Sequence, residues 1–84
     1  MFLADFRPGM TKSRNEKILK AFGKHLQKLR KERNLSQEKL SYLAEPISLN
    51  TISFIERGLV NPTLTNLILI SKALEMPLKD LMDF

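Results

Sequence analysis

The sequence has no cysteine and no tryptophan, and it has only one histidine and three glycines among its 84 residues. Without cysteine, neither a disulfide nor a thiolate metal site can form. The single histidine, His25, has no paired carboxylates nearby with which to bind a metal or to activate a nucleophile. We therefore interpret His25 as a packing residue, and we expect no enzyme activity, no catalytic residue, no metal and no cofactor.

Long apolar runs are missing as well. No stretch approaches the roughly 20 apolar residues that span a bilayer, and the opening residues, MFLADFRPGM, lack the basic-then-apolar order of a secretory signal. These absences predict a cytoplasmic protein without a membrane partner. With 84 residues the chain has room for one small domain, whose core would be only marginally adequate without a partner.

Positive charge is abundant, but it is confined to one segment. Residues 12–33 carry nine Lys or Arg against two Glu, a net charge of +7, whereas residues 34–84 carry four against six. Such a basic segment favours a polyanionic partner.

Apolar periodicity and capping residues predict an all-α protein, a compact bundle of five helices with no strand. Residues 1–11 are expected to form an N-terminal arm, and residues 12–84 the domain. The expected helices are 12–33, 37–44 after Ser36, 49–57 after Ser48, one that Asn61, Pro62 and Thr63 open and that runs to 74, and 78–82.

Helix ends are marked by four residues. Ser36 and Ser48 are predicted N-caps, because a serine hydroxyl accepts a hydrogen bond from the first turn, and each lies between apolar residues at the spacing of a hydrophobic staple. Asn34 is predicted to end the first helix in a left-handed conformation, which Asn tolerates. Gly58 is predicted to end the third.

The first helix is predicted to have two contrasting faces. Its apolar stripe, which we expect to face the core, contains Ile18, Phe22, Leu26 and Leu29. The opposite side carries Lys17, Lys20, Lys24, Lys28 and Lys31. This lysine face is either simply solvated or contacts the polyanion directly, and in both cases it adds long-range attraction.

Residues 49–57 leave a face that core packing does not explain. Ile52 and Ile55 lie on the core side when successive residues turn by about 100°. The residues that then point outward are Asn50, Ser53, Phe54 and Arg57. Two short helices joined by a short turn, the second with such a face, are typical of a helix-turn-helix, whose second helix enters the DNA major groove.

Three segments in order carry a family resemblance: FGKHLQKLRKERNLSQEKL, ISLNTISFIERG and NPTLTNLILISKALEMPLKDL. Together they resemble the Xre type of helix-turn-helix domain, the group that includes phage repressors and Cro. The resemblance covers residues 22–82 and implies a lambda-repressor-like fold that binds double-stranded DNA.

The resemblance also implies roles for individual residues. Gln37 matches a glutamine that holds a DNA phosphate and braces the recognition helix. The positions that match readers of base edges are Leu49, Asn50 and Phe54. The positions that match the rim of the groove are Ser48, Thr51 and Ser53. Arg30 and Glu56 match an internal salt bridge, and we interpret them as structural.

The chain departs from the family pattern at three places. Leu49 and Phe54 are apolar where polar readers of bases are common. The turn Glu45-Pro46-Ile47 replaces the usual glycine and has one residue more. Leu59 and Val60 stand where Lys or Arg often bind phosphates.

Elementary chemistry suggests what the outward residues do on DNA. Asn50 can pair with adenine, and Phe54 can pack on a thymine methyl group, while Arg57 and Gln37 can fix register through phosphates. The alternative is that Phe54 packs against the first two helices and Asn50 is merely solvated.

These features predict a sequence-specific transcriptional regulator that binds operator DNA as a homodimer, with no small-molecule ligand. It resembles small repressors and the controller proteins of restriction and modification systems. The alternative is a protein-interaction module of the same fold, an antitoxin or adaptor that uses Phe54, Leu59 and Val60 as an apolar patch.

Apolar residues outside the predicted core suggest where two subunits meet. The predicted core stripe of the fourth helix contains Leu64, Leu67, Ile70 and Leu74. The residues left for a dimer interface are Ile68, Leu69, Met82 and Phe84, and the arm adds a possible second contribution through Phe2, Leu3 and Phe6.

Overall fold

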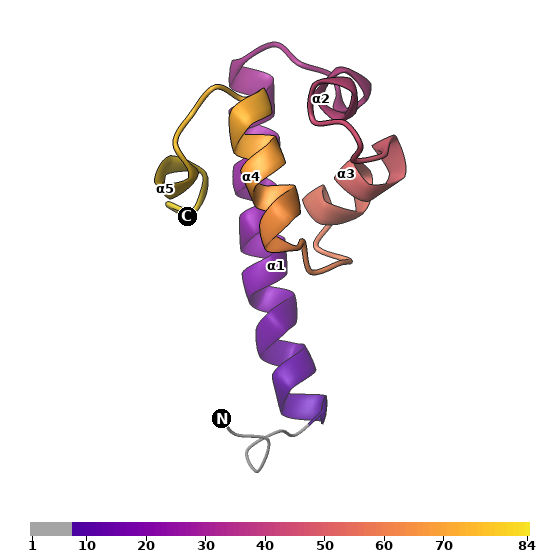
Figure 1. The fold of residues 1–84 in the computed structure, drawn as a ribbon. Helices are drawn as coiled ribbons and strands as arrows, with labels where there is room; N and C mark the ends of the chain where they lie inside the picture. Colours follow the sequence, from indigo (N-terminus) through magenta and orange to yellow (C-terminus); the bar gives the residue numbers. More distant parts are fainter. Residues whose placement is uncertain (1–7) are drawn as a thin grey trace.

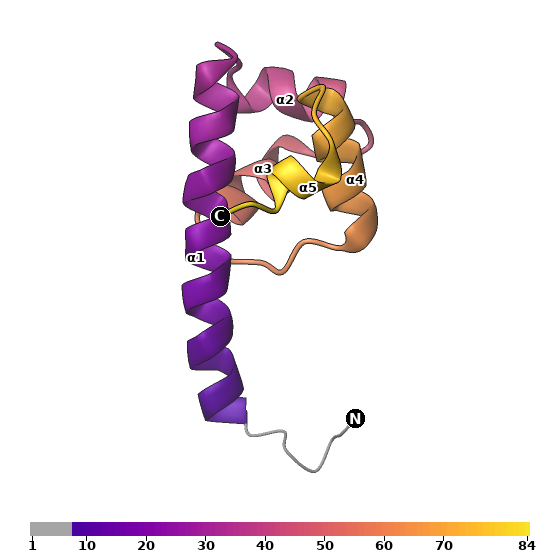
Figure 2. The same cartoon turned by 90° about the vertical axis from the view of Figure 1, so that its left-hand side faces the viewer.

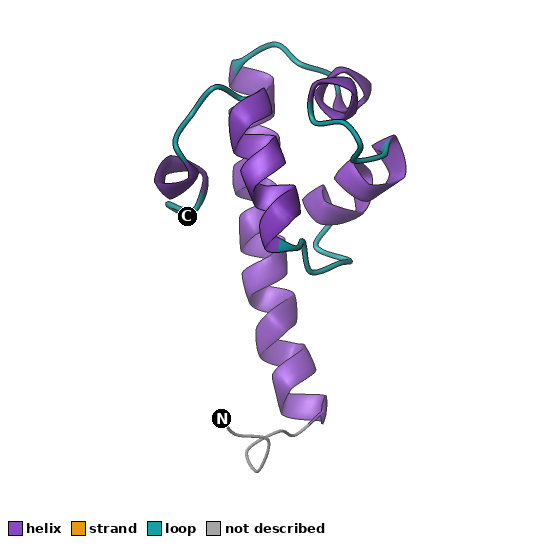
Figure 3. Ribbon diagram, viewed as in Figure 1, coloured by secondary structure: helices purple, strands orange, loops and turns teal. Residues whose placement is uncertain are grey.

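The computed structural model describes residues 8–84, and over this range the chain forms five α-helices and no strand (Figure 1, Figure 3). The helices are α1 (Pro8–Glu32), α2 (Gln37–Leu43), α3 (Leu49–Glu56), α4 (Leu64–Ala73) and α5 (Leu78–Leu81). The predicted all-α, five-helix fold is therefore confirmed. The apolar positions of the expected arm, Phe2, Leu3 and Phe6, lie outside the described residues.

The first helix is longer than predicted. It begins at Pro8 rather than at residue 12, so residues 8–11 are helical. Proline suits the first turn because its missing N–H would be unpaired there and its φ is already helical. The sequence pattern missed this start because Pro8 and Gly9 usually interrupt helices. Figure 2 shows the N-terminal part of α1 running beyond the other four helices.

The other helices begin and end within one residue of the predicted positions. Side-chain caps explain their starts: the hydroxyl groups of Ser36, Ser48 and Thr63 each accept a hydrogen bond from the backbone N–H three residues later, at 2.9 to 3.1 Å. A capping hydroxyl pairs one of the N–H groups that a helix start leaves without a partner. The caps at Ser36 and Ser48 were predicted from the serines and the staple spacing around them, and Thr63 was among the three residues predicted to open α4.

Three helices end in the same way. Asn34, Gly58 and Glu75 have positive φ angles of 56°, 73° and 56°. In each case the following residue donates its backbone N–H to the carbonyl group five residues earlier, at 2.9 to 3.1 Å. This arrangement pairs carbonyl groups that the helix end leaves free. Asn34 and Gly58 were predicted to end helices, whereas Glu75 was missed because glutamate has no preference for this conformation.

The turn between α2 and α3 contains a cis peptide bond between Glu45 and Pro46. Ala44 before it and Ile47 after it are both buried. The longer turn therefore still delivers an apolar residue to the core from either side.

The core lies between α1, the α2–α3 pair and the two C-terminal helices. Its ten buried apolar residues are Phe22, Leu26, Leu40, Ala44, Ile47, Ile52, Ile55, Ile70, Leu74 and Leu81. Leu29 and Leu67 are partly buried against it. Two predicted core residues are wrong: Ile18 is 56% exposed and Leu64 is 66% exposed. Ile18 lies toward the free end of α1 and Leu64 is the first residue of α4, so too little of the domain covers either one.

Two glycines let α1 and α3 approach closely. A Cβ atom on Gly23 would lie 2.7 Å from the carbonyl oxygen of Ile55 and would also clash with that of Glu56. A Cβ atom on Gly58 would lie 2.9 Å from the Cα atom of Lys20. Because the obstructing atoms belong to the backbone, neither clash can be relieved by turning a side chain.

Gly23→Ala should therefore destabilise the domain by about 1 to 3 kcal/mol, as overpacking does. In an exposed helix interior, a change of Gly to Ala would instead stabilise the protein by about 1 kcal/mol. The sign of the change in stability therefore shows whether Gly23 is exposed or lies at a close contact between helices. The midpoint of urea unfolding measures the effect, with the neighbouring exposed change Lys24→Ala as the control. An unchanged or higher midpoint in Gly23→Ala would contradict the close approach.

Candidate nucleic-acid interface

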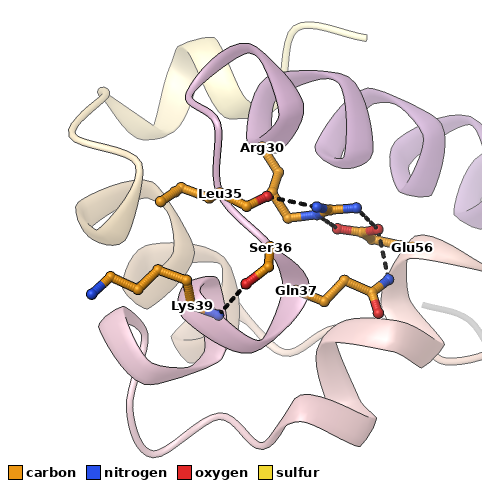
Figure 4. A network of polar contacts seen from close by, with 6 residues as sticks. All are labelled: Arg30, Leu35, Ser36, Gln37, Lys39 and Glu56. Carbon is orange, nitrogen blue, oxygen red and sulfur yellow. Dashed lines mark hydrogen bonds and ion pairs between the residues drawn. The ribbon is translucent and has the colours of Figure 1, made fainter.

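A buried ion pair fixes α3 to α1. The Nε atom of Arg30 lies 2.6 Å from Oε2 of Glu56, and its Nη2 atom donates to Oε1 at 3.1 Å. The two side chains are only 9% and 2% exposed. Arg30 also donates from Nη1 to the carbonyl oxygen of Leu35 at 2.7 Å (Figure 4). Arg30 thus connects α1, the segment leading into α2, and the last residue of α3.

Gln37 connects α2 to the same carboxylate. Its Nε2 atom donates to Oε1 of Glu56 at 2.9 Å (Figure 4). This hydrogen bond joins the first residue of α2 to the last residue of α3, so the two short helices share one polar anchor. An amide nitrogen carries two hydrogens. One of them remains available for another acceptor, because Gln37 is only partly buried.

The outer face of α3 is exposed. Its inner residues Ile52 and Ile55 are 0% and 1% exposed, whereas Leu49 and Phe54 are 43% and 40% exposed. Asn50 is exposed as well. Phe54 is thus not withdrawn against the first two helices. It remains on the outer face, which offers both an amide and an aromatic ring.

Arg57 lies directly after α3 and is exposed. Its guanidinium carbon is 6.0 Å from the centroid of the Phe54 ring. At this distance the cation is attracted to the face of the ring. The contact keeps a positive charge at the C-terminal end of the outer face of α3.

Three hydroxyl residues occupy the edge of this face. Ser48 is exposed, while Thr51 and Ser53 are partly buried. The Oγ atom of Ser48 accepts from the backbone N–H of Thr51 and lies 3.0 Å from the Oγ1 atom of the same residue. Only one of the two hydroxyl hydrogens is needed for that contact, so the pair keeps one donor for a ligand.

The residues predicted to form a dimer interface differ in their exposure to solvent. Ile68 and Met82 are 37% and 42% exposed. Leu69 is partly buried against the core, so the prediction that it lies outside the core is wrong. Leu69 also lines a pocket with Ser48 and Thr51, so only part of its side chain is covered.

Phe84 is half exposed and half engaged within its own chain. Its ring contacts Phe22 edge to face, with 5.4 Å between centroids and 65° between planes. The centroid of the His25 ring is 6.0 Å away, and Nε2 of His25 lies 3.3 Å from the backbone oxygen of Asp80. His25 therefore packs between α1 and the C-terminal segment.

The alternative apolar patch is not continuous. Leu59 is 56% exposed, but Val60 is partly buried and packs against the core. Of the three residues of the predicted patch, only Phe54 and Leu59 are therefore exposed.

Two absences concern only the part of the chain that the structure describes. No group of three or more His, Cys, Asp or Glu side chains there is placed to bind a metal ion. No helix there is long and apolar enough to cross a membrane.

Comparison with known proteins agrees with this geometry. A family model described as helix-turn-helix matches residues 26–81. Control protein C.BamHI of Bacillus amyloliquefaciens is 44% identical over 64 residues, which cover 75% of this chain and 78% of the relative. The crystal structure of the restriction-modification controller protein C.AhdI from Aeromonas hydrophila is similar with a TM-score of 0.75 and 32% identity. This match covers 79% of the present chain and 94% of that one.

Removing one partner of the buried ion pair should strongly destabilise the domain. We expect Glu56→Ala to lower the free energy of unfolding by about 3 to 5 kcal/mol, because it leaves the Arg30 guanidinium buried and uncompensated. Urea unfolding measures the loss, with the exposed change Glu38→Ala as the control. Replacing both partners, with Arg30→Met and Glu56→Leu, should recover much of the stability. If Glu56→Ala unfolds at the same midpoint as the control, the pair does not hold the helices together.

Proposed function

Because the chain belongs to the helix-turn-helix family, we propose that it is a sequence-specific DNA-binding transcriptional regulator whose α3 enters the major groove of operator DNA. The observation that carries this proposal is the outer face of α3. It exposes an amide, an aromatic ring and a guanidinium, while the buried ion pair and the core fix the inner face. A helix of eight residues is not stable alone, so a rigidly held, exposed face of this kind favours recognition over packing.

Asn50 and Phe54 are the proposed readers of sequence. An Asn side chain pairs with N6 and N7 of adenine, and an apolar group packs on the thymine methyl group. Leu49 offers a second apolar contact at the start of the helix. The face as a whole therefore favours A·T base pairs within the half-site.

Other residues are proposed to position α3 without reading bases. Gln37 has a free amide hydrogen for a phosphate and is held by Glu56. Arg57 supplies a positive charge at the end of α3. The hydroxyl residues at the edge, which are Ser48, Thr51 and Ser53, complete the proposed phosphate contacts. Contacts of this kind set register and orientation but carry no sequence information.

The printed names of the relatives narrow the class of regulator. One is a control protein, and the other is a restriction-modification controller protein. We infer that this chain is a controller of the same class, and that its helix-turn-helix domain both binds DNA and dimerises.

We also propose that the regulator binds DNA as a homodimer through α4, α5 and the C-terminus. A single module of this size buries little DNA surface, and helix-turn-helix proteins bind two half-sites about 34 Å apart. Ile68 and Met82 supply the exposed apolar centre of the proposed interface, and Leu69 and Phe84 its partly covered edge. A two-fold axis there would give both subunits the same contacts.

Substitution of Asn50 tests the proposed readout. On a duplex selected from a random DNA pool, Asn50→Ala should weaken binding by about 1 to 3 kcal/mol and relax one base position. Gln37→Ala should weaken binding to selected and random duplexes alike. Asn61→Ala, an exposed asparagine outside α3, is the control. Equal losses on both duplexes for Asn50→Ala would show that this residue does not read sequence.

Substitution of Ile68 and Met82 tests the proposed dimer. Ile68→Glu combined with Met82→Glu should give the mass of a monomer in solution, because it places like charges across a two-fold interface. Affinity for the selected duplex should fall with it. Leu59→Glu alters an apolar residue outside the interface that is more exposed than either, at 56%, and should leave the mass unchanged. A doubly substituted protein that stays dimeric would place the interface elsewhere.

A further inference from the structure

Five lysines form a continuous row along α1. Lys17, Lys20, Lys24, Lys28 and Lys31 are all exposed, and their spacing of three or four residues places them on one face of a helix. We call them the lysine row. Among the side chains of residues 15–84, the only ion pair joins Arg30 to Glu56. No lysine of the row is therefore neutralised within that part of the chain.

The lysine row passes directly beside the end of α3. The positive φ of Gly58 and the absence of its side chain bring this residue against Lys20, where an added Cβ atom would be 2.7 Å from Lys20 Cγ. Gly58 is the residue that follows Arg57. Lys20 therefore contacts the residue that follows Arg57, at the end of α3.

The loop after α3 supplies no charge of its own. Residues 58–61 are Gly-Leu-Val-Asn, so after Arg57 this loop adds no positive charge, whereas Lys20 of the lysine row lies against Gly58. Lys17 lies one helical turn beyond Lys20, in the direction in which α1 runs past the other helices (Figure 2). The row therefore reaches further than the helix-turn-helix itself.

We propose that Lys17, Lys20 and Lys24 bind DNA phosphates that flank the part of the groove entered by α3. This inference rests on the proposed function, because it assumes that α3 lies in the major groove. Duplex DNA carries one negative charge per roughly 1.7 Å of its axis, so three lysines on two turns of helix meet several phosphates. Lysine acts as a point charge on a flexible stem. The contact adds affinity and extends the bound length of DNA, but it does not read sequence.

Two variants that lose the same number of lysines test whether DNA binding depends on where the positive charge lies rather than on the net charge of the protein. One variant carries Lys17→Gln and Lys24→Gln. The control carries Lys72→Gln and Lys79→Gln, which removes the same charge from α4 and α5. Because these helices carry the proposed dimer interface, the mass in solution of both variants is first shown to equal that of the wild type. Lys20 is left intact because its stem lies against Gly58. In Figure 1, α5 and α3 lie on opposite sides of α1.

The first readout is the salt dependence of binding to the selected duplex and to a random duplex of equal length. The logarithm of the binding constant falls with the logarithm of salt concentration, with a slope of about 0.9 per phosphate contact. For each subunit bound, we expect the α1 variant to lose about two contacts' worth of slope on both duplexes. The control should retain the wild-type slope. Equal slopes in the two variants would overturn the inference, because they would show only a general effect of net charge.

The second readout is the length of the duplex. Trimming the selected duplex to the bases that the selection defines should weaken wild-type binding and control binding more than it weakens binding by the α1 variant. An identical loss in all three proteins would also overturn the inference. Failure of the proposed function has a different signature, because a wild-type protein that binds selected and random duplexes equally reads no sequence, whatever its salt slope.

Discussion

The geometry of the recognition helix depends on one buried ion pair. Arg30 and Glu56 are 26 positions apart in sequence, yet their side chains meet at 2.6 Å with almost no exposure. Burying two charges is unfavourable unless hydrogen bonds satisfy the remaining polar atoms, and here Leu35 and Gln37 provide them. Among the side chains of residues 15–84, no buried polar atom lacks a partner. The pair therefore specifies one position of α3, since any other position would leave a charge unpaired.

The ion pair is effective because the backbones beside it are unusually close. Gly23 admits the last carbonyl groups of α3, and Gly58 lies against Lys20. Between these contacts, Ile52 and Ile55 enter the core. A helix this short is stabilised by packing rather than by its own hydrogen bonds. All of that packing comes from one side of α3. The residues on its other side are not needed for the core, so they can be suited to binding a ligand.

Local signals made much of this fold predictable. Ser36, Ser48, Asn34 and Gly58 act on backbone groups a few residues away, so their effect can be inferred without the rest of the chain. Burial is different. Periodicity indicates that Ile18 and Leu64 share a face with core residues, but it cannot indicate whether another helix covers them. Gly23 carries no local signal either, because its role exists only where two helices cross.

The candidate site, like the fold, could be predicted where local sequence signals determine it, but not where distant segments pack together. The pattern identified which residues of α3 point outward, and the Arg30–Glu56 contact followed from the family resemblance. The pattern could not show that tertiary packing partly buries Leu69 and Val60, or that Lys20 lies beside Gly58.

The contact between Lys20 and Gly58 places a charged helix next to the helix proposed to read bases. The face of α3 itself is uncharged apart from Arg57 at its end, whereas the neighbouring α1 is strongly basic. Neutral side chains distinguish bases by hydrogen bonds and shape, while charges attract every phosphate equally. Because the charges lie on a second helix, they can strengthen the attraction to DNA without lowering the sequence specificity of the contacts that α3 makes.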